Sequence, residues 1–228
     1  RVYYREVRLM IRVRFMEELS KLNHEMTEMG ALCEDVISKA GNAMISGDKS
    51  VAESVKPQTE EIDRKEREIE DLCLRLLLEQ QPVAGDLRKI SAALKMITDM
   101  ERIGDQAGDI AEITGYLEKG EGELGGSRIG GGHVREMALK TIRMVNGSID
   151  AYVKQDPDTA RKVIDSDDIV DGLFSEVKSG LIQLIIRHPE FGEYAMDLLM
   201  IAKYFERTGD HAVNIARWVV FAVTGERE

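Results

Sequence analysis

Two short segments of the chain carry oxygen-donor side chains at a spacing that suits metal binding. The donor positions are Glu101, Asp105 and Asp109 in the first segment and Glu206, Asp210 and Asn214 in the second. Residues four apart on a helix lie on the same face about one turn apart, so each segment places its donors in a row. Because like charges at this spacing repel each other, we expect a positive group to lie against each row.

A third acidic pair with the same spacing, Asp167 and Asp171, lies earlier in the second half. Asp167 falls within an apolar seam, and a carboxylate that is buried there must be paired or bound to a metal. Two antiparallel helices that each present such a pair bring four oxygen donors together. This donor set suits iron, manganese, magnesium or zinc. The corresponding positions in the first half are Thr59 and Asp63.

We therefore predict one metal cluster in each half. The first comprises Asp63, Glu101, Asp105 and Asp109, and the second comprises Asp167, Asp171, Glu206 and Asp210, with Asn214 as a candidate neutral ligand. Thr59 stands where a carboxylate is expected, so full occupancy of the first cluster stays open. The alternative is that the rows only form salt bridges with Arg102, Arg207 or a neighbouring helix. His211 lies one residue further round the helix than Asp210, which favours a surface or capping role.

Gly104 and Gly209 immediately precede the two aspartates Asp105 and Asp210. A glycine inside a helix costs about 1 kcal/mol of stability relative to alanine. The missing side chain allows the close approach of either another helix or a ligand. The sequence leaves both explanations open.

Apolar residues at alternating steps of three and four predict three helices in the first half, at residues 15–40, 51–79 and 90–117. Seven of the thirteen residues from 120 to 132 are glycine, a composition typical of a flexible linker. The second half repeats the plan, with helices at 133–154, 157–187 and 191–223.

The two acidic segments also reveal an internal repeat. Glu101-Arg-Ile-Gly-Asp105 aligns with Glu206-Arg-Thr-Gly-Asp210 at an offset of 105 residues, which indicates duplication. We therefore predict an all-α protein of two tandem, pseudo-symmetric three-helix bundles. The predicted division is a first bundle at 1–119, a glycine-rich linker at 120–132 and a second bundle at 133–228.

Composition excludes several classes of function. A formal charge of −11 argues against binding nucleic acid or an anionic membrane surface through net charge. Apolar stretches are far shorter than the roughly 20 residues of a membrane span, and no secretory signal is recognisable, so we expect a soluble, cytoplasmic protein. The usual nucleotide-binding and hydrolase motifs are missing. We predict no catalytic residues and no enzymatic activity.

The doubled Glu-Arg-x-Gly-Asp motif, with Pro82-Val-Ala-Gly-Asp-Leu-Arg88 leading into the first copy, resembles the PhoU family. The resemblance implies a dimeric regulator that represses the phosphate-starvation response when phosphate is plentiful. It also implies two partners, the cytoplasmic subunit of a phosphate ABC transporter and a membrane sensor histidine kinase. Some family members carry multinuclear iron or zinc clusters on their acidic motifs, which map onto the Glu101, Asp167 and Glu206 pairs.

The sequence thus predicts a metal-binding regulator of phosphate uptake and signalling that meets the membrane only through its partners. One rival is a metal-dependent phosphohydrolase, since a polynuclear carboxylate site can activate water. Another is a structural helical adaptor without metal. Phosphatase assays and metal analysis distinguish the three.

Overall fold

The computed structural model describes residues 2–80, 82–117 and 131–227, and within these ranges it contains helices and no strand. The long helices of the first half are α1 (Val2–Ser46), α3 (Lys56–Gln80) and α4 (Ala84–Tyr116). Those of the second half are α5 (Gly131–Lys154), α7 (Asp167–Arg187) and α8 (Gly192–Thr224). Two short helices, α2 (Lys49–Glu53) and α6 (Pro157–Asp165), and a 3₁₀ turn, η1 (Pro189–Phe191), complete the order. The predicted all-α class is confirmed.

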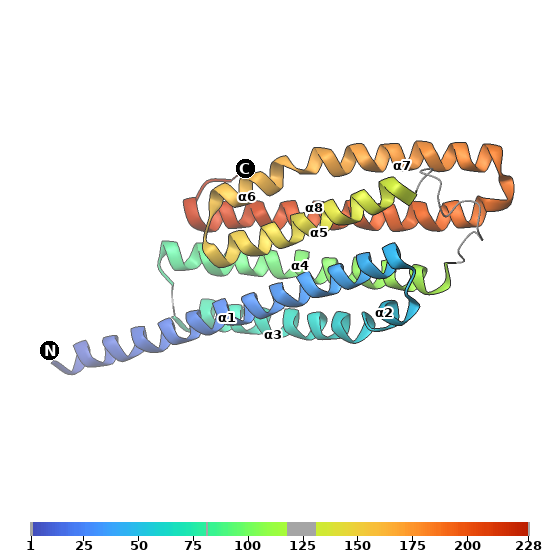
Figure 1. The fold of residues 1–228 in the computed structure, drawn as a ribbon. Coiled ribbons are helices and arrows are strands. Elements are labelled where there is room, and N and C mark those ends of the chain that lie inside the picture. The colour runs from blue at the N-terminus through green and yellow to red at the C-terminus, as the bar shows by residue number, and fades with distance from the viewer. Residues whose placement is uncertain (1, 81, 118–130, 228) are drawn as a thin grey trace.

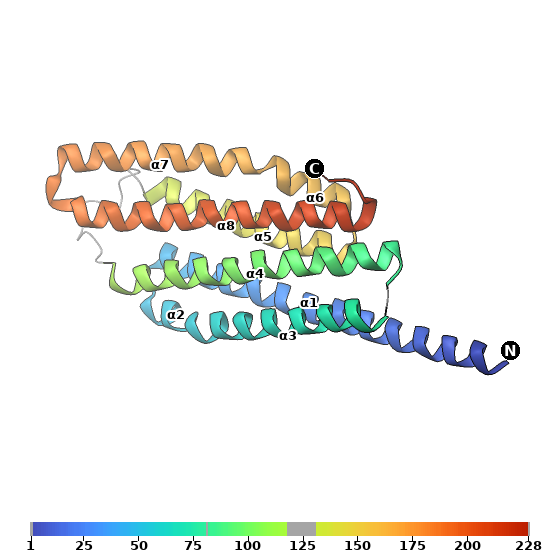
Figure 2. The ribbon, with the colours of Figure 1, turned by 180° about the vertical axis from the view of Figure 1, so that it is seen from behind.

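The two halves form two stacked layers of roughly aligned helices, seen from opposite sides in Figures 1 and 2. Helices α1, α3 and α4 pack against one another, and so do α5 to α8. The layers meet where α4 packs against α8 and α1 against α5, and their buried apolar side chains form one continuous core. The tandem-bundle prediction is confirmed, and the helices that carry the two acidic rows lie side by side at the centre.

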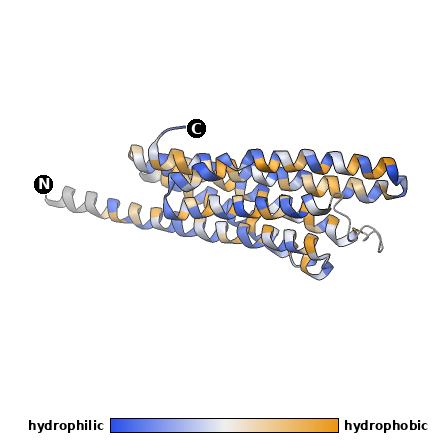
Figure 3. Cartoon of the chain, turned by 45° about the horizontal axis from the view of Figure 1, so that its top comes forward, coloured by the Kyte–Doolittle hydropathy of each residue, from blue (hydrophilic) through white to orange (hydrophobic). Residues whose placement is uncertain are grey.

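The core follows from the apolar periodicity of each helix. On α4 the buried side chains include Met96, Met100, Ile103, Ala107 and Ile110, which recur every three or four residues. Figure 3 shows apolar and polar residues alternating along the helices in this way. None of the helices in the described ranges is long and apolar enough to cross a membrane.

Helix α1 begins at Val2, well before the predicted start at residue 15. In Figure 1 its N-terminal part projects beyond the bundle. Phe15 is buried, whereas Met10 and Val13 are at least half exposed. Because the start of the helix projects beyond the other helices, it needs no apolar seam, and the periodicity could not predict it.

The predicted helix at 51–79 is wrong in one respect, since the chain forms α2 and α3 with a break at Ser54 and Val55. Asp48 caps α2 by accepting hydrogen bonds from the backbone N–H groups of Ser50 and Val51. A continuous helix would need an N–H at Pro57, which has none, and its ring would clash with the preceding turn. The break therefore occurs just before Pro57.

The predicted helix at 157–187 is likewise interrupted, at Ser166 between α6 and α7. The Ser166 hydroxyl donates to the carbonyl oxygen of Val163 at 2.7 Å, and its backbone N–H donates to the same carbonyl. Asp165 to Asp168 are all poor helix formers, because their short polar side chains compete for backbone hydrogen bonds. This local competition ends α6.

Helix α5 begins at Gly131, two residues before the predicted start, and the rest of the predicted linker, 120–130, lies outside the described residues. Helices α1 and α5 approach closely at two glycines. An added Cβ at Gly30 would lie 2.7 Å from Cγ2 of Ile149, and one at Gly41 would lie 2.8 Å from Cδ1 of Ile142. The two layers can come this close only because these positions lack side chains.

Candidate metal centre

Three carboxylates from the first half meet across α3 and α4. Asp63 on α3 and Glu101 and Asp105 on α4 each offer an oxygen, and these three oxygens lie within 4.8 Å of one another. Gly104 makes this approach possible, because an added Cβ would lie 3.2 Å from Cδ1 of Ile62, the residue before Asp63. Of the two explanations for Gly104, the structure supports close packing of the helices, and this packing positions the carboxylates.

The local electrostatics favour a cation at this group. Burial raises the pKa of the Glu101 carboxyl, and the charge of Asp105 raises it further, with smaller contributions from Glu66 and Asp63. A divalent cation among these oxygens would relieve both the repulsion and the loss of hydration. The donor set therefore fits a metal ion.

Arg102 supplies part of the positive charge that the sequence led us to expect. Its Nη1 lies 3.1 Å from Oδ2 of Asp105, and its Nε lies 3.4 Å from Oε2 of Glu101. The Arg102 side chain is 52% exposed, so solvent screens these contacts, and such pairs contribute about 0 to 1 kcal/mol. Arg102 leaves the pKa of Glu101 raised.

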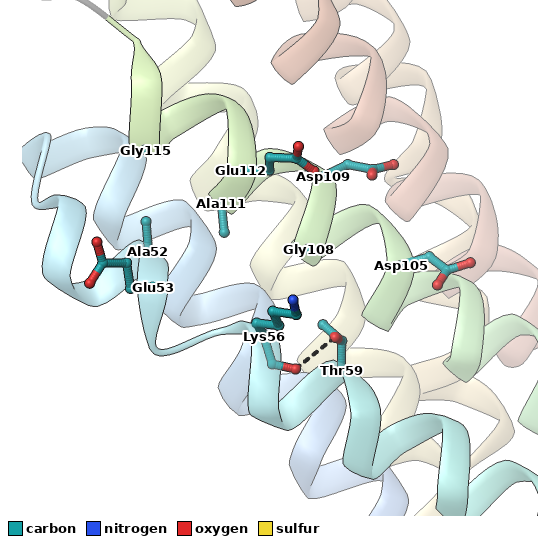
Figure 4. Close-up of a pocket in the computed structure, with 10 residues that line it drawn as sticks. All are labelled: Ala52, Glu53, Lys56, Thr59, Asp105, Gly108, Asp109, Ala111, Glu112 and Gly115. Atoms are coloured by element: carbon teal, nitrogen blue, oxygen red, sulfur yellow. Dashed lines mark hydrogen bonds between the residues drawn. The ribbon is translucent and has the colours of Figure 1, made fainter.

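Asp109 does not join the three-carboxylate group. The Tyr204 hydroxyl on α8 partly offsets the rise in its pKa, and in Figure 4 the Asp109 carboxylate points toward that helix. Burial raises the pKa of Asp109, and the charges of Asp105 and Glu112 add to the shift. Asp109 therefore connects the two layers.

Asp105 and Asp109 also line a cavity of about 600 Å³ between α4 and the turn that joins α2 to α3 (Figure 4). Thr59, where the sequence led us to expect a carboxylate, lines the same cavity, and its hydroxyl donates to the backbone carbonyl of Lys56 at 2.9 Å. The cavity thus borders the candidate metal-binding group at Asp105.

The residues of the second predicted cluster lie on α7 and α8 and act electrostatically on one another. Its members are Asp167, Asp171, Glu206 and Asp210. Burial raises the pKa of Asp167, and the charges of Asp171 and Asp210 raise it further. However, within the described residues no three of their oxygens lie within 4.8 Å of one another, as the oxygens of the first group do. Lys203 Nζ already lies 2.6 Å from Oε2 of Glu206. The first group is therefore the more compact, despite Thr59.

In the metal-free protein, Asp210→Asn is expected to increase the free energy of unfolding at pH 7.5 by about 0.3 kcal/mol. Burial, Glu206 and Asp171 together raise the pKa of Asp210, so its charged form is disfavoured in the folded state. The gain should grow as the pH rises from the ordinary carboxyl pKa to the raised pKa of Asp210 and stay constant above it. It should vanish below the ordinary pKa, where folded and unfolded chains are both protonated. Urea unfolding with a chelator at pH 7.5 and pH 3.5 measures it. A destabilised variant at pH 7.5 would contradict the prediction.

Asn214 contacts the other layer. Its Nδ2 donates to Oδ1 of Asp99 on α4 at 3.1 Å, and Nδ1 of His211 lies 2.8 Å from the same oxygen. His211 is therefore a contact between the layers, where a surface or capping role was expected. At the 105-residue offset, Asp99 corresponds to Tyr204 and Asp109 to Asn214. The Asp99–Asn214 and Tyr204–Asp109 contacts are thus symmetry-related across α4 and α8.

The two predicted clusters contain neither Asp99 nor Glu66. Glu66 lies one turn after Asp63 on α3 and acts electrostatically on Glu101. Its i, i+3 spacing from Asp63 could have identified it. Asp99 could have been found only by applying the repeat offset to Tyr204, because nothing in its own neighbourhood marks it.

Fold and site together define a class of protein, a duplicated all-helical bundle with an acidic row on the last long helix of each half. The PhoU domain family matches residues 26–114 and 134–219, which together cover most of the chain. The chain belongs to the PhoU family.

Individual relatives agree with this assignment. The chain is 33% identical over 212 residues to a phosphate-specific transport system accessory protein PhoU homolog of Pseudomonas aeruginosa, covering 92% of this chain and 86% of that protein. It is 32% identical over 219 residues to the Clostridium acetobutylicum homolog of the same name, covering 96% and 98%.

Two solved structures share the fold. The crystal structure of PhoU from Pseudomonas aeruginosa superposes with a TM-score of 0.87 at 32% identity, covering 93% of this chain and all of that one. The phosphate transport system regulatory protein PhoU from Streptococcus pneumoniae gives a TM-score of 0.83 at 26% identity, covering 94% and 99%.

Proposed function

We propose that this chain is a metal-binding negative regulator of phosphate uptake and of the phosphate-starvation response. The observation that carries the metal-binding part is the meeting of Asp63, Glu101 and Asp105 across α3 and α4. The regulatory part is supported by relatives named as accessory proteins of the phosphate-specific transport system. In this proposal the protein works in the cytoplasm as a homodimer and catalyses no reaction.

The proposed metal is iron or zinc, held in the first group by carboxylate oxygens. A bound divalent cation would neutralise part of the row and would make Glu101 carry its full charge. The surface that a partner meets near α3 and α4 would then differ between the metal-bound and the metal-free protein. The proposed partners are the cytoplasmic subunit of a phosphate ABC transporter and a phosphate-sensing histidine kinase.

Metal loading is expected to change the affinity of the protein for these partners. Removing negative charge at one surface alters electrostatic steering toward a charged partner, an effect that weakens as salt shortens the screening length. We expect at least about a threefold difference in dissociation constant between metal-loaded and chelator-treated protein at low salt. Calorimetry against the transporter subunit and the cytoplasmic portion of the kinase, at two salt concentrations, measures it.

The outcomes of this experiment distinguish the components of the proposal. Equal affinities with and without metal would give the cluster a structural role only. The absence of binding to both partners would contradict the phosphate-signalling role itself. Turnover of a phosphate ester by the metal-loaded protein at ordinary enzymatic rates would favour a phosphohydrolase.

A further inference from the structure

A cavity of about 310 Å³ lies in the second half, where α5 runs beside α6 and the start of α7. Lys140 and Arg143 line it from α5, and Lys162 lines it from α6. None of the nine lining residues carries a carboxylate. In a chain with a net charge of −11, three cations around one cavity form a local reversal of charge.

Other basic side chains of this protein form ion pairs with a neighbouring carboxylate, whereas these three do not. Lys65, for example, lies 2.6 Å from Oε2 of Glu25. Within the described ranges no carboxylate lies within 4.0 Å of the charged nitrogens of Lys140, Arg143 or Lys162. Their charges are therefore available to a ligand in the cavity.

Lys162 acts on Asp156, whose pKa is held below its usual range chiefly by hydrogen bonds from Thr159, with a smaller contribution from Lys162. Asp156 caps α6, and its oxygens accept from the backbone N–H groups of Asp158 and Thr159 and from the Thr159 hydroxyl. The Asp156 carboxylate is thus hydrogen-bonded to the first turn of its own helix, and it does not line the cavity.

The rest of the lining sets the shape of the cavity. Val163 and Met144 are buried and form an apolar wall, and Gly147 lets α5 approach α6 so closely that an added Cβ would lie 2.8 Å from Cγ2 of Val163. The hydroxyls of Thr159 and Ser166 also line the cavity, but both already donate hydrogen bonds within their own helical turns. Recognition of a ligand would therefore depend on the cations.

We propose that this cavity binds a small phosphate-bearing anion, either inorganic phosphate or the phosphate groups of a nucleotide. An arginine donates two parallel hydrogen bonds to such an oxyanion, and lysines add mobile point charges. The cavity is large enough for a phosphate group with its bridging water molecules. Neither acidic cluster contributes a residue to its lining, so this proposal does not depend on metal binding.

The test compares two charge-matched double variants with the unmodified full chain. The cavity variant is Arg143→Gln with Lys162→Gln, and the control is Arg135→Gln with Lys178→Gln, which removes the same charges from exposed positions on α5 and α7. Inorganic phosphate is titrated at low ionic strength while amide resonances are followed by NMR. We expect saturable shifts around the cavity in the parent and the control. The dissociation constant should rise by about tenfold or more in the cavity variant.

The same titration with ADP identifies the source of the phosphate group. Tighter binding of ADP, with shifts at the same residues, would assign the cavity to a nucleotide, whereas tighter binding of inorganic phosphate would assign it to the free anion. Shifts that do not saturate, or an equal loss of affinity in both double variants, would overturn the proposal. Matching thermal unfolding of the parent and both variants would show that the fold is intact.

Discussion

Replacing Glu101 with Gln and Asp105 with Asn is expected to lower the affinity for the proposed metal by about 100-fold or more. Both oxygens belong to the compact group with Asp63, and the substitutions keep the side-chain shape while removing two negative ligands. Because the substitutions also remove a like-charge pair, the metal-free helix should be no less stable. Metal content after dialysis and a competition titration with a chelator measure the change.

The duplicated motif offers a matched comparison. Glu206→Gln with Asp210→Asn makes the same change in the second half, where Lys203 already contacts Glu206. We expect this variant to retain the most tightly bound metal. A surface control, Glu68→Gln with Asp71→Asn on α3, removes the same charge from exposed positions. Equal loss of metal from all three variants would indicate that binding follows net charge, and the assignment of the first group would then be wrong.

Phe205→Ala is expected to lower the free energy of unfolding by about 3 to 5 kcal/mol. Phe205 is fully buried on α8, one residue before the second acidic row. Its backbone carbonyl accepts a hydrogen bond from the Thr141 hydroxyl on α5 at 3.2 Å. The truncation would leave a cavity in the core that the two layers share. Denaturant unfolding followed by circular dichroism measures the loss.

Phe221→Ala on the same helix is the control, because Phe221 is only partly buried and contacts Trp218 edge to face. It should cost clearly less than Phe205→Ala. Thr141→Val separates the hydrogen bond from the cavity, since it removes the hydroxyl and keeps most of the volume. Similar losses from Phe205→Ala and Phe221→Ala would mean that the core at Phe205 relaxes around the truncation.

Helices that pack against another helix of the chain could be predicted, because burial imposes a periodic apolar seam on them. The seam from Phe15 to Ala40 identified the packed part of α1, yet it gave no signal for the first turns, which project from the bundle. The breaks at Ser54 and Ser166 escaped prediction for another reason. The first depends on Pro57, whose ring and missing N–H exclude a continuous helix, and the second depends on the local hydrogen bonds of Ser166. Neither break interrupts the apolar seam.

Part of the candidate site was also predictable. The i, i+4 spacing placed Glu101 and Asp105 on one face, and the structure brings Asp63 to them. Spacing along one helix could not show that Asp109 and Asn214 turn toward the other layer, because that depends on how α4 packs against α8. The packing between helices therefore determines which oxygen donors of each acidic row lie close to other carboxylates.

The symmetric contacts between α4 and α8 bear on how such a protein evolves. A single three-helix unit would leave exposed the face of its last helix that α4 and α8 bury against each other. It would bury that face by pairing with an identical copy, as in an isologous dimer. In that dimer every substitution appears twice, so positions 99 and 109 would have to suit each other in both copies. Once the units are fused, each copy varies alone. One contact can then keep a tyrosine beside Asp109 while its counterpart uses an asparagine donor for Asp99. Gene fusion thus lets two halves of one ancestry specialise while their shared interface is preserved.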